Sequence, residues 1–199
     1  MVSRSADHHA SYVEALGGAR ASTHVCDVRD RAALAATLAD IGEVDVLYHG
    51  PGGGGTPPGP ITEVDSAAVR DAMDNWVHPA VDAVGLVLPG MVARGSGVLL
   101  FAGGLSSVVA LPPLGALALA TAALRNYAVT LNAALADSGV YAGTLTIGGL
   151  VRGGDIHAMV TADPGRYGEV GTLDPAEIAA TAWEMATTRD RAESVFTAM

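Results

Sequence analysis

One histidine follows a predicted strand at a position suited to acid–base chemistry. Residues 43–49, EVDVLYH, are largely apolar, and the glycine- and proline-rich run at 50–60 follows them, which predicts a buried strand and then a loop. Open α/β sheets bind ligands at the carboxyl ends of their strands. His49 is the only predicted strand-end group that titrates near neutral pH, so it is our candidate acid or base. The alternative is a histidine bonded to a loop carbonyl.

Other aromatic and basic side chains are candidates for contact with a small-molecule substrate. Tyr48 lies at the same predicted strand end. Arg152 and His157 belong to residues 152–172, a mixed stretch that predicts an irregular lid over the strand ends. These two could meet a polar or anionic substrate, and the alternative is a pair of solvated loop residues. His78 stands on a predicted helix and is typical of a helix-surface or cap group.

Composition argues against nucleic acid and membrane partners. The formal net charge is −10 and the basic residues, all arginine, form no stripe along the sequence, so the positive surface of a nucleic-acid binder is missing. The amino-terminal residues MVSRSADHHASY contain no apolar core of signal-peptide length. The most apolar region, 105–124, is interrupted by two prolines and a glycine, so we expect no membrane segment.

The cysteine and histidine residues indicate where the protein is located and whether it binds a metal ion. The single cysteine, Cys26, cannot form an internal disulfide, which favours a reducing, cytoplasmic location. The adjacent pair His8 and His9 lacks the spacing that places two ligands on one helix face. We therefore expect no metal site.

Helical and strand patterns alternate along the chain. This alternation predicts βαβ units with right-handed crossovers, a largely parallel sheet and one domain over residues 1–199. Asp30 and Asp174 are the expected amino-terminal caps of two helices, and Pro79 is expected to kink a third. The predicted helices cover 5–16, 30–42, 65–93, 113–136 and 174–188, and the predicted strands cover 22–28, 43–49, 96–103, 139–148 and 193–199.

Three stretches resemble the short-chain dehydrogenase/reductase family, and the resemblance extends over nearly the whole chain. It implies a Rossmann-like three-layer α/β sandwich with a mainly parallel sheet. The first βαβ half of the family, with its Thr-Gly-x-x-x-Gly-x-Gly turn, has no counterpart here. Ser3 and Arg4 fall where a 2′-phosphate contact often lies, and Asp27 with Val28 falls on the family's adenine contact. The matching stretches are HVCDVRDRAALAATLADIGEVDVLYHGPG, LPGMVARGSGVLLFAGG and TIGGLVRGG.

A glycine pattern in the predicted loop imitates a dinucleotide fingerprint. Gly50, Gly52 and Gly55 have the spacing G-x-G-x-x-G after a predicted strand. Prolines follow at once and prevent the helix whose amino terminus would hold the phosphates, so an ordinary loop is the better interpretation.

The family's catalytic positions carry other residues in this chain. Alignment of LALATAAL with the family's Tyr-x-Ala-Ser-Lys-Ala-Ala-Leu places Leu117 on the tyrosine and Thr121 on the lysine. The family's spacing places Gly104 on its serine and Trp76 on its helix asparagine; for Trp76 the alternative is a core tryptophan. Carbonyl reduction needs a phenol that donates a proton and a cation that lowers its pKa, and the sequence contains no lysine.

These changes favour a cofactor-independent enzyme of cyclase, isomerase or lyase type acting on an apolar metabolite, with NADP possible only through an upstream segment. The alternatives are a non-catalytic partner of an intact relative and an NAD(P)-dependent oxidoreductase whose amino terminus lies outside this sequence. The expected substrate pocket comprises Tyr48, Trp76, Gly104, Leu117, Thr121, Gly149, Arg152 and His157.

The resemblance also implies an assembly. The helix at 113–136 is apolar around more than one face and must be covered on both sides. In the family this helix and the one at 65–93 form a subunit interface, which implies a homodimer or a heteromer with an intact paralogue. The family's first strand is central, so its deletion would expose an edge beside VDVLYH. Either strand 22–28 moves in to pair there, or a second chain supplies the partner.

Overall fold

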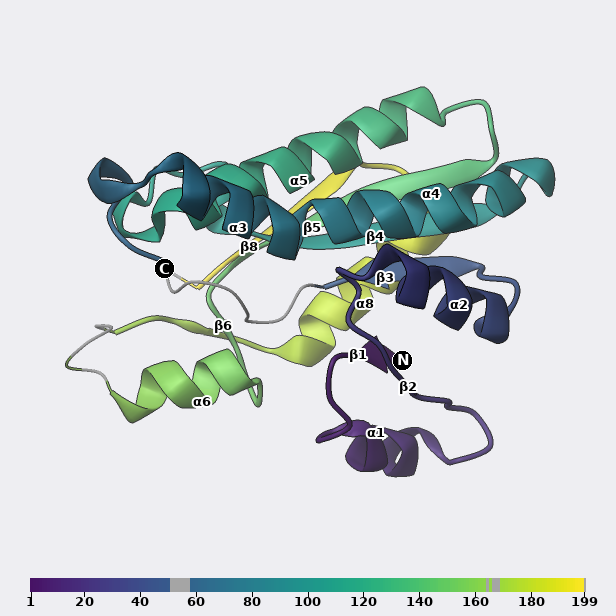
Figure 1. Ribbon diagram of the computed structural model, residues 1–199, viewed down its shortest axis with the longest axis horizontal. Helices are drawn as coiled ribbons and strands as arrows, with labels where there is room; N and C mark the ends of the chain where they lie inside the picture. Colours follow the sequence, from purple (N-terminus) through teal and green to yellow (C-terminus); the bar gives the residue numbers. More distant parts are fainter. Residues whose placement is uncertain (51–57, 164, 166–168, 199) are drawn as a thin grey trace.

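The computed structural model describes residues 1–50, 58–163, 165 and 169–198, and it forms a parallel sheet covered by helices on both faces (Figure 1). The main sheet has the order β3–β4–β5–β8, and two smaller parallel sheets pair β1 with β2 and β6 with β7. The strands are β1 Val2–Ser3, β2 His24–Val25, β3 Val46–His49, β4 Gly97–Gly104, β5 Val140–Gly148, β6 Leu150–Val151, β7 Thr172–Leu173 and β8 Glu193–Thr197.

Helices cover the main sheet because its central strands are apolar on both faces. Phe101 of β4 faces α4 and α5, whereas Leu100 faces α8, and each contributes to a separate buried cluster. This continuous apolar character is typical of a parallel sheet buried on both sides. The helices are α1 His9–Leu16, α2 Arg31–Ile41, α3 Ser66–Trp76, α4 His78–Ala93, α5 Gly115–Ala134, α6 Asp155–Ala162 and α8 Pro175–Thr188, with short 3-10 turns η1 Ile61–Glu63, η2 Leu105–Ser107 and η3 Pro112–Leu114.

Helix ends follow the local signals in the sequence. The Asp30 carboxylate accepts the backbone N–H groups of Ala32 and Ala33 at 2.9 and 3.0 Å, so it caps α2 as predicted. Asp174 caps α8 in the same manner. The predicted helix at 65–93 divides into α3 and α4 at Val77, because Pro79 in the first turn of α4 cannot supply a backbone donor to the preceding helix.

Three predicted elements differ in the structure. The segment 152–172 is not irregular throughout, because α6 forms behind Gly154 with an acidic first turn that complements the helix dipole. The predicted helix at 5–16 begins only at His9, since no side chain caps its first turn. Strand 22–28 shortens to two residues that pair with β1, so it does not move in beside β3.

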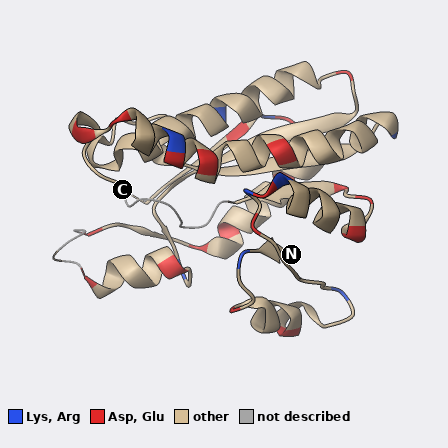
Figure 2. Cartoon of the chain, viewed as in Figure 1, with Lys and Arg blue, Asp and Glu red and all other residues tan. Residues whose placement is uncertain are grey.

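Two helical stretches, Ser66–Ala93 and Pro112–Ala134, are long and apolar enough to cross a membrane by length and composition alone. The first is interrupted between α3 and α4. Both pack on one face of the sheet through buried residues such as Met91 and Leu124, as core helices of soluble proteins do. Charged residues, mostly acidic, are scattered along the chain (Figure 2).

Candidate functional site

A pair of hydroxyl groups lies at the carboxyl end of β4, where the sequence places the family's catalytic residues. The Ser106 Oγ is 2.9 Å from the Thr121 Oγ1, which joins the turn after β4 to the buried face of α5. Gly104 lies against the same threonine, since a Cβ on this glycine would be 3.6 Å from the Thr121 methyl group. The structure therefore brings Gly104 and Thr121 together at this turn. Ser106 is a functional candidate that the alignment missed, because it lies two residues beyond the aligned position.

The hydrogen-bond direction determines what this pair can do. The Thr121 hydroxyl donates to the Ala118 carbonyl at 3.1 Å, so it accepts the proton of Ser106. Ser106 then presents lone pairs and no free proton to its surroundings. Leu117 lies one helical turn before Thr121 on the same face of α5 and offers only an apolar surface. The pair can accept a hydrogen bond from a ligand hydroxyl, but neither residue supplies an acid for carbonyl reduction.

Replacing Thr121 by valine should lower the free energy of unfolding by about 1 kcal/mol, because Ser106 loses its acceptor while the side-chain volume is conserved. Urea denaturation measures the change. Thr161→Val is the matched control, since the Thr161 hydroxyl donates to the His157 and Ala158 carbonyls within its own exposed helix. Its effect should stay within roughly 0.5 kcal/mol of zero. Equal losses for the two variants would show that the Ser106 contact contributes nothing.

His49 occupies the end of β3 with an unusual hydrogen-bond pattern. Its Nε2 is buried and has no hydrogen-bond partner within the described ranges. The ring also bonds to the backbone of Trp76, which leaves Nδ1 as the donor. Burial lowers the pKa of His49, and the bond to Trp76 opposes that shift in part. The lowered pKa favours the neutral imidazole, in which Nε2 accepts a proton or a hydrogen bond.

Several predicted pocket residues lie away from this edge. Tyr48 is exposed and lines a groove on the α8 face of the sheet. Trp76 packs against the core cluster between the sheet, α4 and α5, which is the structural alternative that the sequence left open. A Cβ on Gly149 would lie 2.9 Å from the Ala198 Cβ and 3.0 Å from the Gly171 carbonyl oxygen. Gly149 thus serves close backbone packing against the carboxyl-terminal segment and does not line an open pocket.

The predicted lid residues have local roles. The Arg152 guanidinium lies 3.7 Å from the Asp174 carboxylate and is largely exposed. His157 lies on α6 and is half-buried. His78 forms an exposed pair with Asp74 at 2.7 Å, one turn earlier along the chain, which matches the predicted helix-surface role. Among the described residues, no group of three or more His, Cys, Asp or Glu side chains could hold a metal ion.

A partly buried ion pair joins α5 to β8 and was not predicted. Arg125 of α5 donates to both carboxylate oxygens of Glu193 at 2.7 and 2.5 Å, and Thr146 donates to the same carboxylate at 2.7 Å. The hydrogen bonds from Arg125 lower the pKa of Glu193, although burial opposes this shift. The partners are 68 residues apart, so no sequence spacing could have paired them.

The carboxyl ends of β1 and β2 bring together the residues expected at the adenosine end of a dinucleotide. The Cys26 N–H donates to the Ser3 carbonyl at 2.9 Å, so Arg4 and Asp27 follow from paired strands. Hydrogen bonds from the Arg29 side chain are the main cause that lowers the pKa of Asp27 to about 2, and the charge of Arg4 contributes in the same direction. The position therefore combines an ionised carboxylate with a nearby cation.

Comparison with known proteins places this geometry in a family. The family model for short chain dehydrogenases matches residues 1–155. No curated protein matches the chain. An oxidoreductase of the short chain dehydrogenase/reductase family from Burkholderia thailandensis has 26% identity and a TM-score of 0.79, and the match covers 99% of this chain and 79% of that one.

Two further solved structures share the fold. A short chain oxidoreductase from Pseudomonas aeruginosa, solved with NADPH and containing an atypical catalytic center, is 19% identical with a TM-score of 0.80 over 98% of this chain and 83% of that chain. A gluconate 5-dehydrogenase from Burkholderia cenocepacia in complex with NADP and tartrate is 18% identical with a TM-score of 0.79, covering 100% and 83%.

The expectation of a cofactor-free protein is wrong. Relatives with this fold hold NADPH or NADP, including one with an atypical catalytic center. The absence of the family's Thr-Gly-x-x-x-Gly-x-Gly turn and Tyr–Lys pair led to that expectation, whereas the relatives share a nucleotide-binding fold without regard to the catalytic pair. In the separate G-x-G-x-x-G pattern that begins at Gly50, Gly52 and Gly55 lie outside the described residues. The match of the family model over most of the chain, with the parallel α/β sheet, shows that the chain belongs to the short chain dehydrogenase family.

Proposed function

We propose that this protein binds NADP(H), with the adenosine end of the dinucleotide over the carboxyl ends of β1 and β2. The observation that carries the proposal is the parallel pairing of β1 with β2, which places Arg4 and Asp27 directly after neighbouring strand ends. A carboxylate accepts hydrogen bonds from adenine or ribose groups, and a guanidinium pairs with a 2′-phosphate through two parallel bonds. These residues fit the adenosine end. The described ranges contain no glycine-rich turn that fits the pyrophosphate.

The residues near the nicotinamide side support an atypical centre. A bound NADP⁺ would accept a hydride from the carbon that carries a substrate hydroxyl, and the family's usual tyrosine is replaced here by Leu117. We propose that Ser106 accepts a hydrogen bond from a hydroxyl of an apolar small-molecule substrate. In this proposal His49 acts as an acceptor through Nε2, because its lowered pKa keeps the imidazole neutral.

A non-catalytic NADP(H)-binding subunit is the second candidate function. The donation from Thr121 to Ala118 favours it, since the hydroxyl pair then has no proton for a substrate. Reduction of NADP⁺ with a panel of secondary alcohols separates the two candidates. The atypical enzyme requires turnover with at least one of them, and the non-catalytic subunit requires binding without turnover.

Calorimetric titration with NADPH and NADH tests the proposal. The protein should bind NADPH more tightly than NADH, and Arg4→Ala should weaken NADPH binding by roughly 10- to 100-fold through loss of a charge-assisted hydrogen bond. The affinity for NADH should stay unchanged. Arg20→Ala is the matched control, because Arg20 is an exposed arginine of the segment before β2. If Arg4→Ala weakened the binding of NADPH and NADH equally, Arg4 would not be the residue that pairs with the 2′-phosphate.

We also propose a cytoplasmic homodimer through the outer faces of α4 and α5. Large apolar side chains remain exposed on those faces in the single chain: Val81, Val92 and Leu119. Contiguous apolar surface on a soluble protein commonly marks an interface. A heteromer with an intact relative would use the same faces.

A further inference from the structure

His9 is a buried histidine with a definite hydrogen-bond pattern on the first turn of α1. It is 7% exposed, whereas its neighbour His8 is exposed and lies 3.5 Å from Asp155. The His9 Nε2 is 2.7 Å from the Ser3 Oγ, and the Ser3 hydroxyl itself donates to the Ser5 carbonyl at 2.7 Å. Because the only hydroxyl proton of Ser3 is used in that bond, the His9 Nε2 carries a hydrogen and donates it to Ser3.

These bonds fix the backbone on both sides of Arg4. Before Arg4, Ser3 belongs to β1, and its carbonyl accepts the Cys26 N–H of the neighbouring chain segment at 2.9 Å. After Arg4, the Ser5 carbonyl is held by the Ser3 hydroxyl, which accepts its second bond from His9. A guanidinium forms two parallel bonds with a phosphate only from a defined direction. The turn that His9 holds therefore determines whether Arg4 is aligned for such bonds.

We propose that His9 is a positioning residue for dinucleotide selection, which acts through Ser3 by holding the turn 3–5 so that Arg4 meets the 2′-phosphate of NADPH. This inference rests on the proposed function, because it adds a supporting hydrogen bond behind the site assigned to Arg4. Supporting bonds of this kind keep a binding side chain close to its productive geometry. In this proposal His9 itself does not contact the dinucleotide.

Two His9 variants that differ by one methylene group test the proposal through the affinities for NADPH and NADH. The side chain in His9→Asn is too short to reach Ser3, so this variant should bind NADPH roughly 5- to 10-fold more weakly and NADH within about 2-fold of the unmodified protein. His9→Gln places an amide N–H at about the reach of Nε2, and it should bind NADPH within about 2-fold of the unmodified protein. Calorimetric titration measures these affinities. Equal NADPH affinities for His9→Asn and His9→Gln would overturn the proposal.

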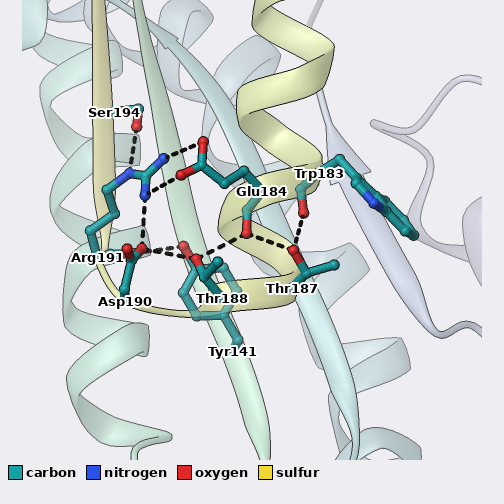
Figure 3. A network of polar contacts seen from close by, with 8 residues as sticks. All are labelled: Tyr141, Trp183, Glu184, Thr187, Thr188, Asp190, Arg191 and Ser194. Carbon is teal, nitrogen blue, oxygen red and sulfur yellow. Dashed lines mark hydrogen bonds and ion pairs between the residues drawn. The ribbon is translucent and has the colours of Figure 1, made fainter.

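Two control variants separate positioning from a general loss of stability. Tyr141→Phe removes a hydrogen bond of the same length, which the buried tyrosine donates to the Arg191 carbonyl at 2.7 Å in the polar network of Figure 3. That network adjoins β8, at the edge of the main sheet opposite β3, whereas β1 and β3 pack against one buried cluster. Tyr141→Phe and His9→Asn should each lower the melting temperature by roughly 2–4 °C, but Tyr141→Phe should keep the preference for NADPH. His8→Asn changes the exposed neighbour and should also keep that preference. An equal loss of preference in Tyr141→Phe would assign the effect to stability alone.

Ser3→Ala removes the acceptor through which His9 acts. By itself it should reduce NADPH affinity by a similar factor, which keeps the test decisive where a His9 variant does not fold. Within Ser3→Ala, His9→Asn should change NADPH affinity by less than about 2-fold, whereas a full effect in that background would show that His9 does not act through Ser3.

The unmodified protein and Arg4→Ala distinguish failure of this inference from failure of the proposed function. An unmodified protein that binds NADPH no more tightly than NADH contradicts both. If the unmodified protein prefers NADPH and Arg4→Ala removes that preference, an undiminished preference in His9→Asn contradicts only the role of His9.

Discussion

Replacing Phe101 by alanine should lower the free energy of unfolding by about 3–5 kcal/mol. Phe101 is fully buried at the centre of β4, and its ring meets the Tyr127 ring edge-on at a centroid distance of 5.8 Å. Removal of the ring leaves a cavity that the rigid neighbouring strands cannot close. Urea denaturation at neutral pH measures the loss.

The same substitution should affect the site through His49. The His49 ring lies 6.5 Å from the Phe101 ring, and burial is the main cause of its lowered pKa. A cavity that admits water should therefore raise the pKa of His49 toward its ordinary value, which an NMR titration of the imidazole would show. Phe196→Ala is the control, because the chain's other phenylalanine is only half-buried on β8. Comparable destabilisation by both variants would refute the central role of Phe101.

Arg125→Ala should cost about 2–3 kcal/mol near neutral pH. Without Arg125, the Glu193 carboxylate remains partly buried and has lost its cation. The side chains are 33% exposed for Arg125 and 20% exposed for Glu193, so the loss of stability should be smaller than for a fully buried pair. Arg31→Ala is the control, since its pair with Asp82 is more exposed and should contribute at most about 0.5 kcal/mol.

The pH dependence of this ion pair has a definite sign. The pKa of Glu193 is lowered in the folded protein. The ion pair therefore contributes fully to the free energy of unfolding above the unfolded carboxyl pKa of about 4.3, and this contribution declines as the pH falls through the pKa of Glu193 in the folded protein. In the Glu193→Gln variant the side chain carries no charge at any pH. Its free energy of unfolding should therefore lie below that of the unmodified protein near neutral pH, and the difference should shrink below about pH 4. Urea unfolding over a series of pH values measures this difference. A constant deficit across the acidic range would show that the carboxylate charge does not stabilise the fold.

The cofactor prediction failed for a physical reason. The sequence showed that Leu117 and Thr121 replace a proton donor and a cation, which concerns the chemical step. Dinucleotide binding is a separate property, and in our proposal it uses the strand ends at the adenosine side, where Arg4 and Asp27 were assigned by resemblance alone. Only the pairing of β1 with β2 placed the two side chains near each other.

The sequence by itself determined the features that depend on neighbouring residues. Apolar runs specified β3, β4 and β5, Asp30 and Asp174 specified helix starts, and Pro79 specified the break between α3 and α4, because periodicity, capping and a missing backbone donor act within a few residues. Tertiary structure decided the rest. Ser106 meets Thr121 only when a turn folds against α5, and Arg125 meets Glu193 only when β8 docks beside β5. Such contacts join residues 15 and 68 positions apart, and their free energy comes from packing that no local pattern encodes.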